Sequence, residues 1–231
     1  MSRSGFYGKL AGRGDFVQRD LPPGFVEPWD AWLAAGIQAS RSALGDGWLD
    51  AYLVSPLWRF ALAPGLVGPE PMAGALMPSI DRVGRYFPLT IAQPLAADID
   101  LATLVGGPED WFEAVEALLL STLEEGADFE LFQAGVAALP ELRGEPRRSV
   151  TPGFHQVHFG VTSAAERRAA LAQLGCDGVS LWWGRGSERV APGLLCVSGM
   201  PAAQGFISLL LGADVCTLPA DGFTRATEGR P

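Results

Sequence analysis

Cysteine and histidine are scarce in this sequence, with three of the first and two of the second among 231 residues. Cys176, Cys196 and Cys216 are odd in number, widely spaced and set among apolar neighbours. This pattern favours buried free thiols in a reducing compartment over a disulfide. The scarcity of cysteine therefore argues against a disulfide-stapled secreted fold.

Long hydrophobic runs are also missing. The most apolar run, Phe206–Ala213, is less than half as long as the roughly 18 residues that a membrane span needs. The N-terminus lacks the apolar core of a secretory signal. We therefore expect a cytoplasmic protein that does not insert into membranes.

Recognisable catalytic and metal-binding motifs are absent as well. His155 and His158 form a His-x-x-His pair, but no cysteine or acidic residue stands at a familiar ligand spacing from them. No Gly-x-Ser-x-Gly nucleophile elbow occurs. The sequence predicts a protein that is not an enzyme, with no metal and no cofactor.

Basic residues are missing from one long segment. Residues 96–140 carry ten acidic side chains and no lysine or arginine, and they account for the net charge of −9. Because acidic surfaces repel phosphodiesters and anionic lipids, nucleic acid and membranes are excluded as partners and a basic protein surface is favoured. The segment otherwise has the pattern of two amphipathic helices. Four carboxylates at its start are the candidate partner-binding residues: Glu109, Asp110, Glu113 and Glu116.

Apolar residues make up 48% of the chain, enough for a large packed core. Apolar runs bounded by Pro and Gly predict strands at 6–10, 57–62, 73–79, 87–95, 178–184 and 193–199. Helical spacing and end signals predict helices at 23–44, from 108 onward, at 128–139, 163–175 and 202–211. Interleaved helices and apolar strands predict an α/β fold whose sheet is covered on both faces. Adjacent strand residues face opposite sides, so Trp182 and Trp183 are either both buried beneath different helices or, if one face of the sheet is uncovered, one of them is an exposed anchor for a partner.

The opening stretch GFYGKLAGRGDFVQRDLP combines glycines with a lysine and an Arg-Gly-Asp triplet. It fails the Walker pattern because Leu10 follows Lys9, and it fails the dinucleotide pattern because Val17 stands where a glycine is required. We interpret Gly12 and Gly14 as turn residues beside Asp15.

The densest polar cluster lies between two predicted strands. Its members are Ser79, Asp81, Arg82, Gly84 and Arg85. Two arginines with a serine hydroxyl would suit a phosphate or carboxylate at the end of a sheet. The alternative is a salt bridge from Asp81 to an arginine that staples the connection.

Five segments, in this order and spacing, resemble the TagF family of type VI secretion-associated proteins. They are GFYGKLAGRGDFVQRDLP, SPLWRFALAPG, MPSIDRVGRYFPLT, SLWWG and SGMP. The resemblance covers nearly the whole chain, so residues 1–231 are expected to form a single TagF-like domain with a frayed tail from about residue 214. The resemblance implies the stand-alone form of the family, so we expect no fused phosphatase domain.

The resemblance implies a three-layer α/β/α sandwich, here around a mostly buried mixed sheet. It also implies a cytoplasmic repressor that acts on the type VI apparatus after translation and binds its forkhead-associated scaffold protein. The family offers no catalytic residues to carry over. Two hypotheses follow: the acidic segment from Glu109 to Glu130 docks on a basic partner surface, or Ser79, Arg82 and Arg85 sense a phosphorylated metabolite or nucleotide. For the acidic segment, a merely solvated helix face is the alternative.

Overall fold

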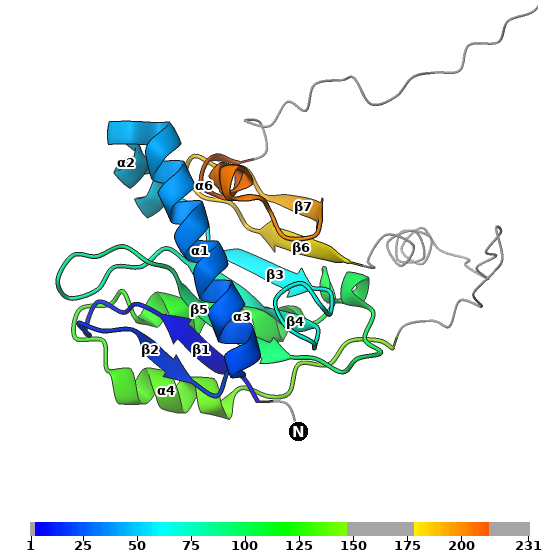
Figure 1. Cartoon of the computed structure of the whole chain (residues 1–231). Coiled ribbons are helices and arrows are strands. Elements are labelled where there is room, and N and C mark those ends of the chain that lie inside the picture. Colours follow the sequence, from blue (N-terminus) through cyan, green and yellow to red (C-terminus); the bar gives the residue numbers. More distant parts are fainter. Residues whose placement is uncertain (1–2, 147–177, 213–231) are drawn as a thin grey trace, which may run out of the picture.

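The computed structural model describes residues 3–146 and 178–212, which are built around one seven-stranded sheet (Figure 1). The strands are β1 (Gly5–Gly8), β2 (Val17–Arg19), β3 (Trp58–Leu62), β4 (Met72–Met77), β5 (Leu89–Pro94), β6 (Val179–Gly184) and β7 (Gly193–Ser198). Their order across the sheet is β2-β1-β5-β4-β3-β6-β7, and every neighbouring pair is antiparallel. All six predicted strands are confirmed to within two residues at each end, whereas β2 was not predicted.

The expected three-layer α/β/α sandwich around a mixed sheet is wrong. The sheet is antiparallel throughout and dominates the fold, and the helices do not cover it completely. Strands β3, β4 and β5 follow one another without an intervening helix, so no parallel crossover is formed. At one edge, β7 alternates between exposed and half-exposed residues, which shows that no described helix covers it.

The longer helices begin and end close to their sequence signals. Their bounds are α1 (Pro23–Leu44), α3 (Glu109–Ser121) and α4 (Phe129–Ala138). Short elements complete the fold: η1 (Gly45–Gly47), α2 (Trp48–Leu53), η2 (Leu101–Leu104), η3 (Ala203–Phe206) and α6 (Ile207–Leu211). Pro23 occupies the first turn of α1, where its missing N–H costs nothing, and Gly45 ends the helix with a φ of 53°.

Two hydrophobic clusters lie on opposite faces of the sheet. On one face, which α1 crosses in Figure 1, Trp29 packs against Phe60 and Trp182. On the other face, Phe112 of α3 packs edge-on against Trp183. Trp182 and Trp183 are both buried, one in each cluster, so neither is an exposed anchor and the first of the two alternatives holds.

Several predictions have other outcomes. Cys196 is a free thiol but is exposed on the uncovered strand β7, so its predicted burial is wrong. The remaining cysteines, both histidines, the predicted helix at 163–175 and the tail from residue 214 lie outside the described residues. Within the described ranges, no helix has the length and apolarity that crossing a bilayer requires.

Candidate functional site at the loop end of the sheet

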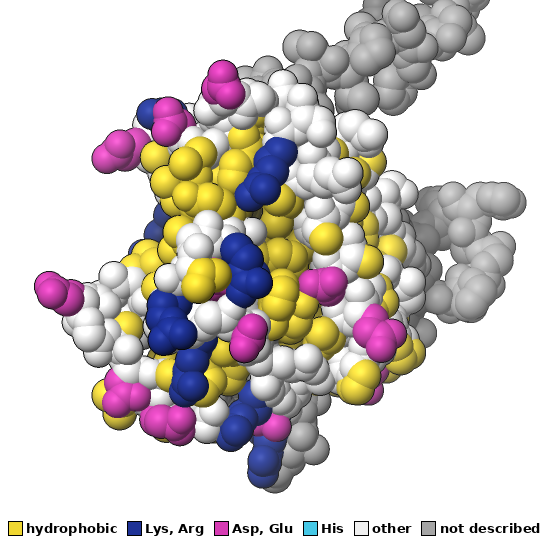
Figure 2. Space-filling view, turned by 60° about the vertical axis from the view of Figure 1, so that its left-hand side comes forward, with side chains coloured by type: hydrophobic (Ala, Val, Ile, Leu, Met, Phe, Trp, Pro, Cys, Tyr) yellow, Lys and Arg dark blue, Asp and Glu magenta, His cyan; other side chains and the backbone are white. Residues whose placement is uncertain are grey.

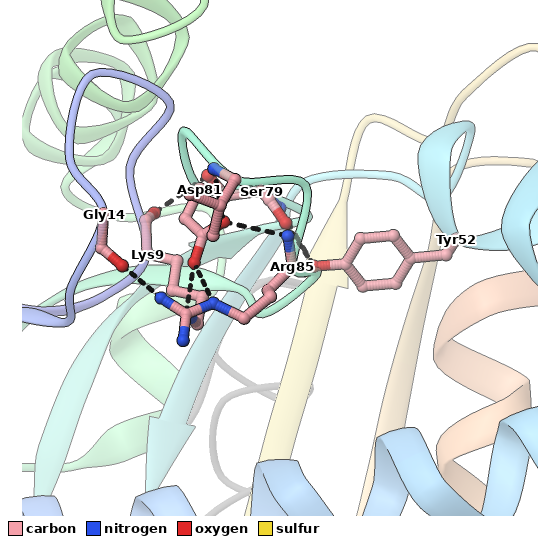
Figure 3. A network of polar contacts seen from close by, with 7 residues as sticks. Lys9, Gly14, Tyr52, Ser79, Asp81 and Arg85 are labelled. Carbon is pink, nitrogen blue, oxygen red and sulfur yellow. Dashed lines mark hydrogen bonds and ion pairs between the residues drawn. The ribbon is translucent and has the colours of Figure 1, made fainter.

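An ion-pair network centred on the buried Asp81 joins the β1–β2 loop to the β4–β5 connection (Figure 3). Lys9 and Arg85 both bind the carboxylate of Asp81, and Arg85 Nε lies 2.6 Å from Oδ2. The same carboxylate accepts the backbone N–H groups of Val83 at 3.0 Å and Arg85 at 2.8 Å. Arg85 Nη2 also donates to the carbonyl of Gly14. Asp81 therefore fixes both loops relative to one another.

The electrostatics favour a permanently ionised Asp81. Burial by itself raises the pKa of this carboxyl group, but the hydrogen bonds from Lys9, Arg85 and Val83 outweigh it and hold the pKa well below its ordinary value of 3.8. One carboxylate faces two cations here, so the network keeps a surplus of positive charge.

Ser79 also makes its contacts inside the chain. Its hydroxyl donates to the carbonyl of Lys9 at 2.8 Å. Its backbone N–H and carbonyl both bind the Tyr52 hydroxyl at 3.0 Å. Ser79 and Asp81 are buried, so their polar groups hold the loops together, as the salt-bridge alternative supposes. Ligand binding by these two residues stays a prediction.

The remaining members of the two predicted motifs are exposed or form turns. Gly12, Asp15 and Arg82 lie at the surface, and Gly84 adopts a φ of 86°, which an L side chain rarely tolerates. The loop from Gly12 to Arg19, Arg82, and the α4 residues Phe129 and Gln133 surround an open hollow of about 500 Å³. The structure therefore brings the glycine loop and Arg82 together, while Ser79 and Asp81 lie beneath the surface.

Most of the predicted acidic docking residues are engaged inside the chain. Arg59 of β3 is buried, and its guanidinium binds Glu109 and Glu116 of α3 at 2.5 Å each. Arg185 pairs with Glu113 and, at 3.8 Å, with Glu116. Burial by itself lowers the pKa of Arg59, but the two carboxylates outweigh it and raise the pKa. Their role in partner binding stays a prediction, since three of the four carboxylates already neutralise arginines.

Arg59 itself was missed by the sequence reasoning, although a signal was present. It is the only charged residue in the apolar strand stretch LWRFAL. A charged side chain in a strand buried on both faces must find an opposite charge. The acidic start of α3 meets that need.

Farther along the acidic segment, carboxylates surround an apolar groove between α3 and α4. The groove has a volume of about 340 Å³, and Glu124, Glu125 and Asp128 lie in its wall together with Leu131. Leu131 is 71% exposed, and Leu123 at the end of α3 is 56% exposed. The acidic residues were predicted from the sequence, but the two leucines were not, because Leu123 follows the end of α3 and Leu131 falls off the buried stripe of α4. The α3–α4 turn is thus both acidic and apolar at its surface.

The described residues contain no metal-binding cluster, and two of their buried tyrosines have shifted pKa values. Residues 3–146 and 178–212 hold no cluster of three or more His, Cys, Asp or Glu that would suit a metal ion. Burial raises the pKa of Tyr52, and burial together with the neighbouring Asp30 raises that of Tyr7. Both hydroxyls therefore stay protonated at neutral pH and serve as hydrogen-bond donors.

Comparison with known proteins places the chain in a family. Residues 5–139, more than half of the chain, match the model of the TagF N-terminal domain, described as type VI secretion system-associated. A crystal structure of PA0076 from Pseudomonas aeruginosa PAO1 is 54% identical, with a TM-score of 0.85, and the match covers 99% of this chain and all of that one. Among curated proteins, none matches the chain. The chain belongs to the TagF N-terminal domain family of type VI secretion system-associated proteins.

Proposed function

We propose that this protein represses a type VI secretion system after translation by binding the system's forkhead-associated scaffold protein in the cytoplasm. It acts by contact and not by catalysis. Membership of a type VI secretion-associated family supports a role in that secretion system. The observation that carries the mode of action is the acidic groove between α3 and α4, with leucines exposed at its side.

The groove has the two properties of a docking surface for a basic, partly apolar segment. Leu131 in the groove wall is 71% exposed, and Leu123, next to the groove residues Thr122 and Glu124 in the chain, is 56% exposed; exposed apolar surface rimmed by polar groups is typical of interaction sites. Glu124 and Glu125 form no ion pair with any described residue, so they are available to a partner's cations. Forkhead-associated domains recognise phosphothreonine with basic and polar loops, which an acidic surface complements.

We assign docking to the end of the acidic segment that carries Glu124 and Glu125, because the carboxylates at its start stabilise the fold. Glu109 and Glu116 compensate the buried Arg59, so neutralising them would disturb the fold as well as any contact. Glu124 and Glu125 are exposed on a turn and can be changed without that effect. Variants at these two residues therefore test docking without altering the stability of the fold.

Binding kinetics with the purified scaffold protein test the proposal. Glu124→Gln combined with Glu125→Gln should slow association several-fold at about 50 mM salt and much less at about 500 mM, because exposed charges act mainly through screened steering. Leu123→Ser combined with Leu131→Ser should speed dissociation about tenfold or more, since apolar anchors hold the complex together. The leucine variant should also fail to repress secretion in a type VI-active cell.

The matched control is Glu27→Gln combined with Glu70→Gln. Both residues are exposed, and the pair changes the net charge by the same amount away from the groove. Equal slowing by the control would show that only net charge matters. Unaltered association and dissociation in both groove variants would refute docking at this groove, and a scaffold protein that never binds the chain would refute the proposed partner.

A further inference from the structure

We propose that the open hollow beside the Gly12–Arg19 loop binds the phosphate of a small phosphorylated molecule. Its volume of about 500 Å³ falls within the range of roughly 300–1,000 Å³ that small-molecule sites occupy. Figure 2 turns this side of the molecule forward and shows Lys and Arg side chains one above another in a band, beside hydrophobic ones. The inference concerns a site separate from the docking groove and does not depend on the proposed partner.

Positive charge is concentrated at the hollow, although the whole chain carries −9. Arg13, Arg19 and Arg82 line it, and Asp15 is the one acidic residue among its lining side chains. The Asp81 network reaches the hollow through the bond from Arg85 to the carbonyl of Gly14, and it adds a further positive charge because Asp81 is the one carboxylate that Lys9 and Arg85 bind among the described residues. An anion that reaches this side of the molecule is therefore attracted locally.

The arginines at the hollow are available to a ligand. Within the described part of the chain, the guanidinium groups of Arg19 and Arg82 make no hydrogen bond or ion pair. Among the charged groups that the structure describes, Arg13 meets only Glu130, in a long ion pair of 3.9 Å, and both side chains are at least half exposed. An exposed ion pair of this kind contributes about 0–1 kcal/mol to stability, so a phosphate can replace Glu130 as the partner of Arg13 at little cost.

The two loops that supply these arginines are already fixed in place. The N–H of Arg82 donates to the carbonyl of Arg13 at 3.0 Å, and Arg85 binds the carbonyl of Gly14. The Arg13 guanidinium lies over the ring of Phe129 at 4.4 Å. Because the loops are ordered before binding, the ligand bears less of the entropic cost.

The chemistry of the lining selects a phosphomonoester with an organic body. Planar guanidinium groups bind phosphate oxygens through pairs of parallel hydrogen bonds. Phe16, which is 45% exposed, and Phe129 provide apolar surface that an inorganic ion would not use. A nucleoside monophosphate or a sugar phosphate combines both features.

Melting temperatures and titration calorimetry on the full chain test the assignment at constant ionic strength. Adenosine 5′-monophosphate and glucose 6-phosphate, each at about 10 mM, should raise the melting temperature by mass action, while adenosine and sulfate should not. Arg82→Gln and Arg13→Gln should each weaken binding about fivefold or more. Both residues are exposed, so neither change should disturb folding, which the melting temperature without ligand checks.

Arg189→Gln is the matched control, since Arg189 is an exposed arginine at the opposite edge of the sheet. Binding that survives in this control and falls in the two hollow variants supports the site. No response to either phosphomonoester would overturn it, as would equal responses in all three variants. A phosphothreonine peptide that binds where both free phosphomonoesters fail would also overturn it, because the ligand would then be a protein.

Discussion

Arg59 is the clearest case in which one residue decides what others can do. Its guanidinium is buried at 3% exposure and is held by Glu116, at 13%, and by the more exposed Glu109, at 44%. Glu116→Gln should lower the free energy of unfolding by about 1.5–3 kcal/mol, because a buried cation loses its best-shielded counter-charge. Glu109→Gln should cost less, since water already screens that carboxylate. Urea denaturation of both variants measures the difference.

Glu113→Gln is the internal control of this series. Among the described residues Glu113 pairs only with Arg185, and both side chains are more than half exposed, so its loss should cost less than about 1 kcal/mol. Equal costs for Glu113, Glu109 and Glu116 would contradict the view that burial of Arg59 sets the ranking.

At the scale of residues, ion pairs between neighbours in the chain could be predicted from the sequence, whereas ion pairs between distant residues could not. A salt bridge between Asp81 and Arg85 was predictable because the two lie four residues apart. The pairing of Asp81 with Lys9 was not, since 72 residues separate them and only the sheet brings them together. For the same reason the acidic start of α3 looked free: Arg59 lies 50 residues before Glu109.

At the scale of elements, a glycine in each of two helices lies close to a neighbouring element: Gly36 of α1 faces η3, and Gly135 of α4 faces α3. A methyl group added at Gly36 of α1 would come within 2.5 Å of the Phe206 ring, near its attachment point. Gly36→Ala gains about 1 kcal/mol of helix propensity but overpacks a buried contact, which costs about 1–3 kcal/mol. We expect a net destabilisation of up to about 2 kcal/mol and a weaker attachment of η3, visible as a lower melting temperature.

Gly135→Ala in α4 is the matched comparison. There the added methyl group would meet the terminal methyl of Leu118, a half-buried side chain that can rotate away. The gain in helix propensity should then prevail, and the melting temperature should stay level or rise slightly. A greater loss at Gly135 than at Gly36 would refute this account of the packing.

Elements themselves were largely readable from the sequence. Helix α1 was predictable over its full length because its apolar residues recur at helical spacing between Pro23 and Gly45. Strand β2 was not, since only Val17 of its three residues is buried. The short helix α2 was missed because Trp48–Leu53 is too brief to show a period.

On the scale of the whole molecule, the order of helices and strands along the chain led to the wrong prediction of strand direction. An apolar strand buried on both faces reads the same in a parallel and an antiparallel sheet, and helices between strands suggested crossovers. The actual sheet places β1 beside β5 and β3 beside β6 through long-range antiparallel pairs. Nothing in a single sequence specifies such pairings, so the mixed sheet was wrong although most of its strands were correct.

The antiparallel order predicts how stability is distributed through the molecule. Strands β3, β4 and β5 are hydrogen-bonded on both sides and buried, whereas β2 and β7 are edge strands and β7 is largely exposed. Amide hydrogens bonded within the central strands should exchange at least about tenfold more slowly than those of β2 and β7, because edge strands open without unfolding the core. Hydrogen exchange followed by mass spectrometry, at neutral pH and without ligand, measures this. Equal protection of β7 and β4 would contradict the edge position of β7, and rapid exchange in β4 would contradict the sheet order itself.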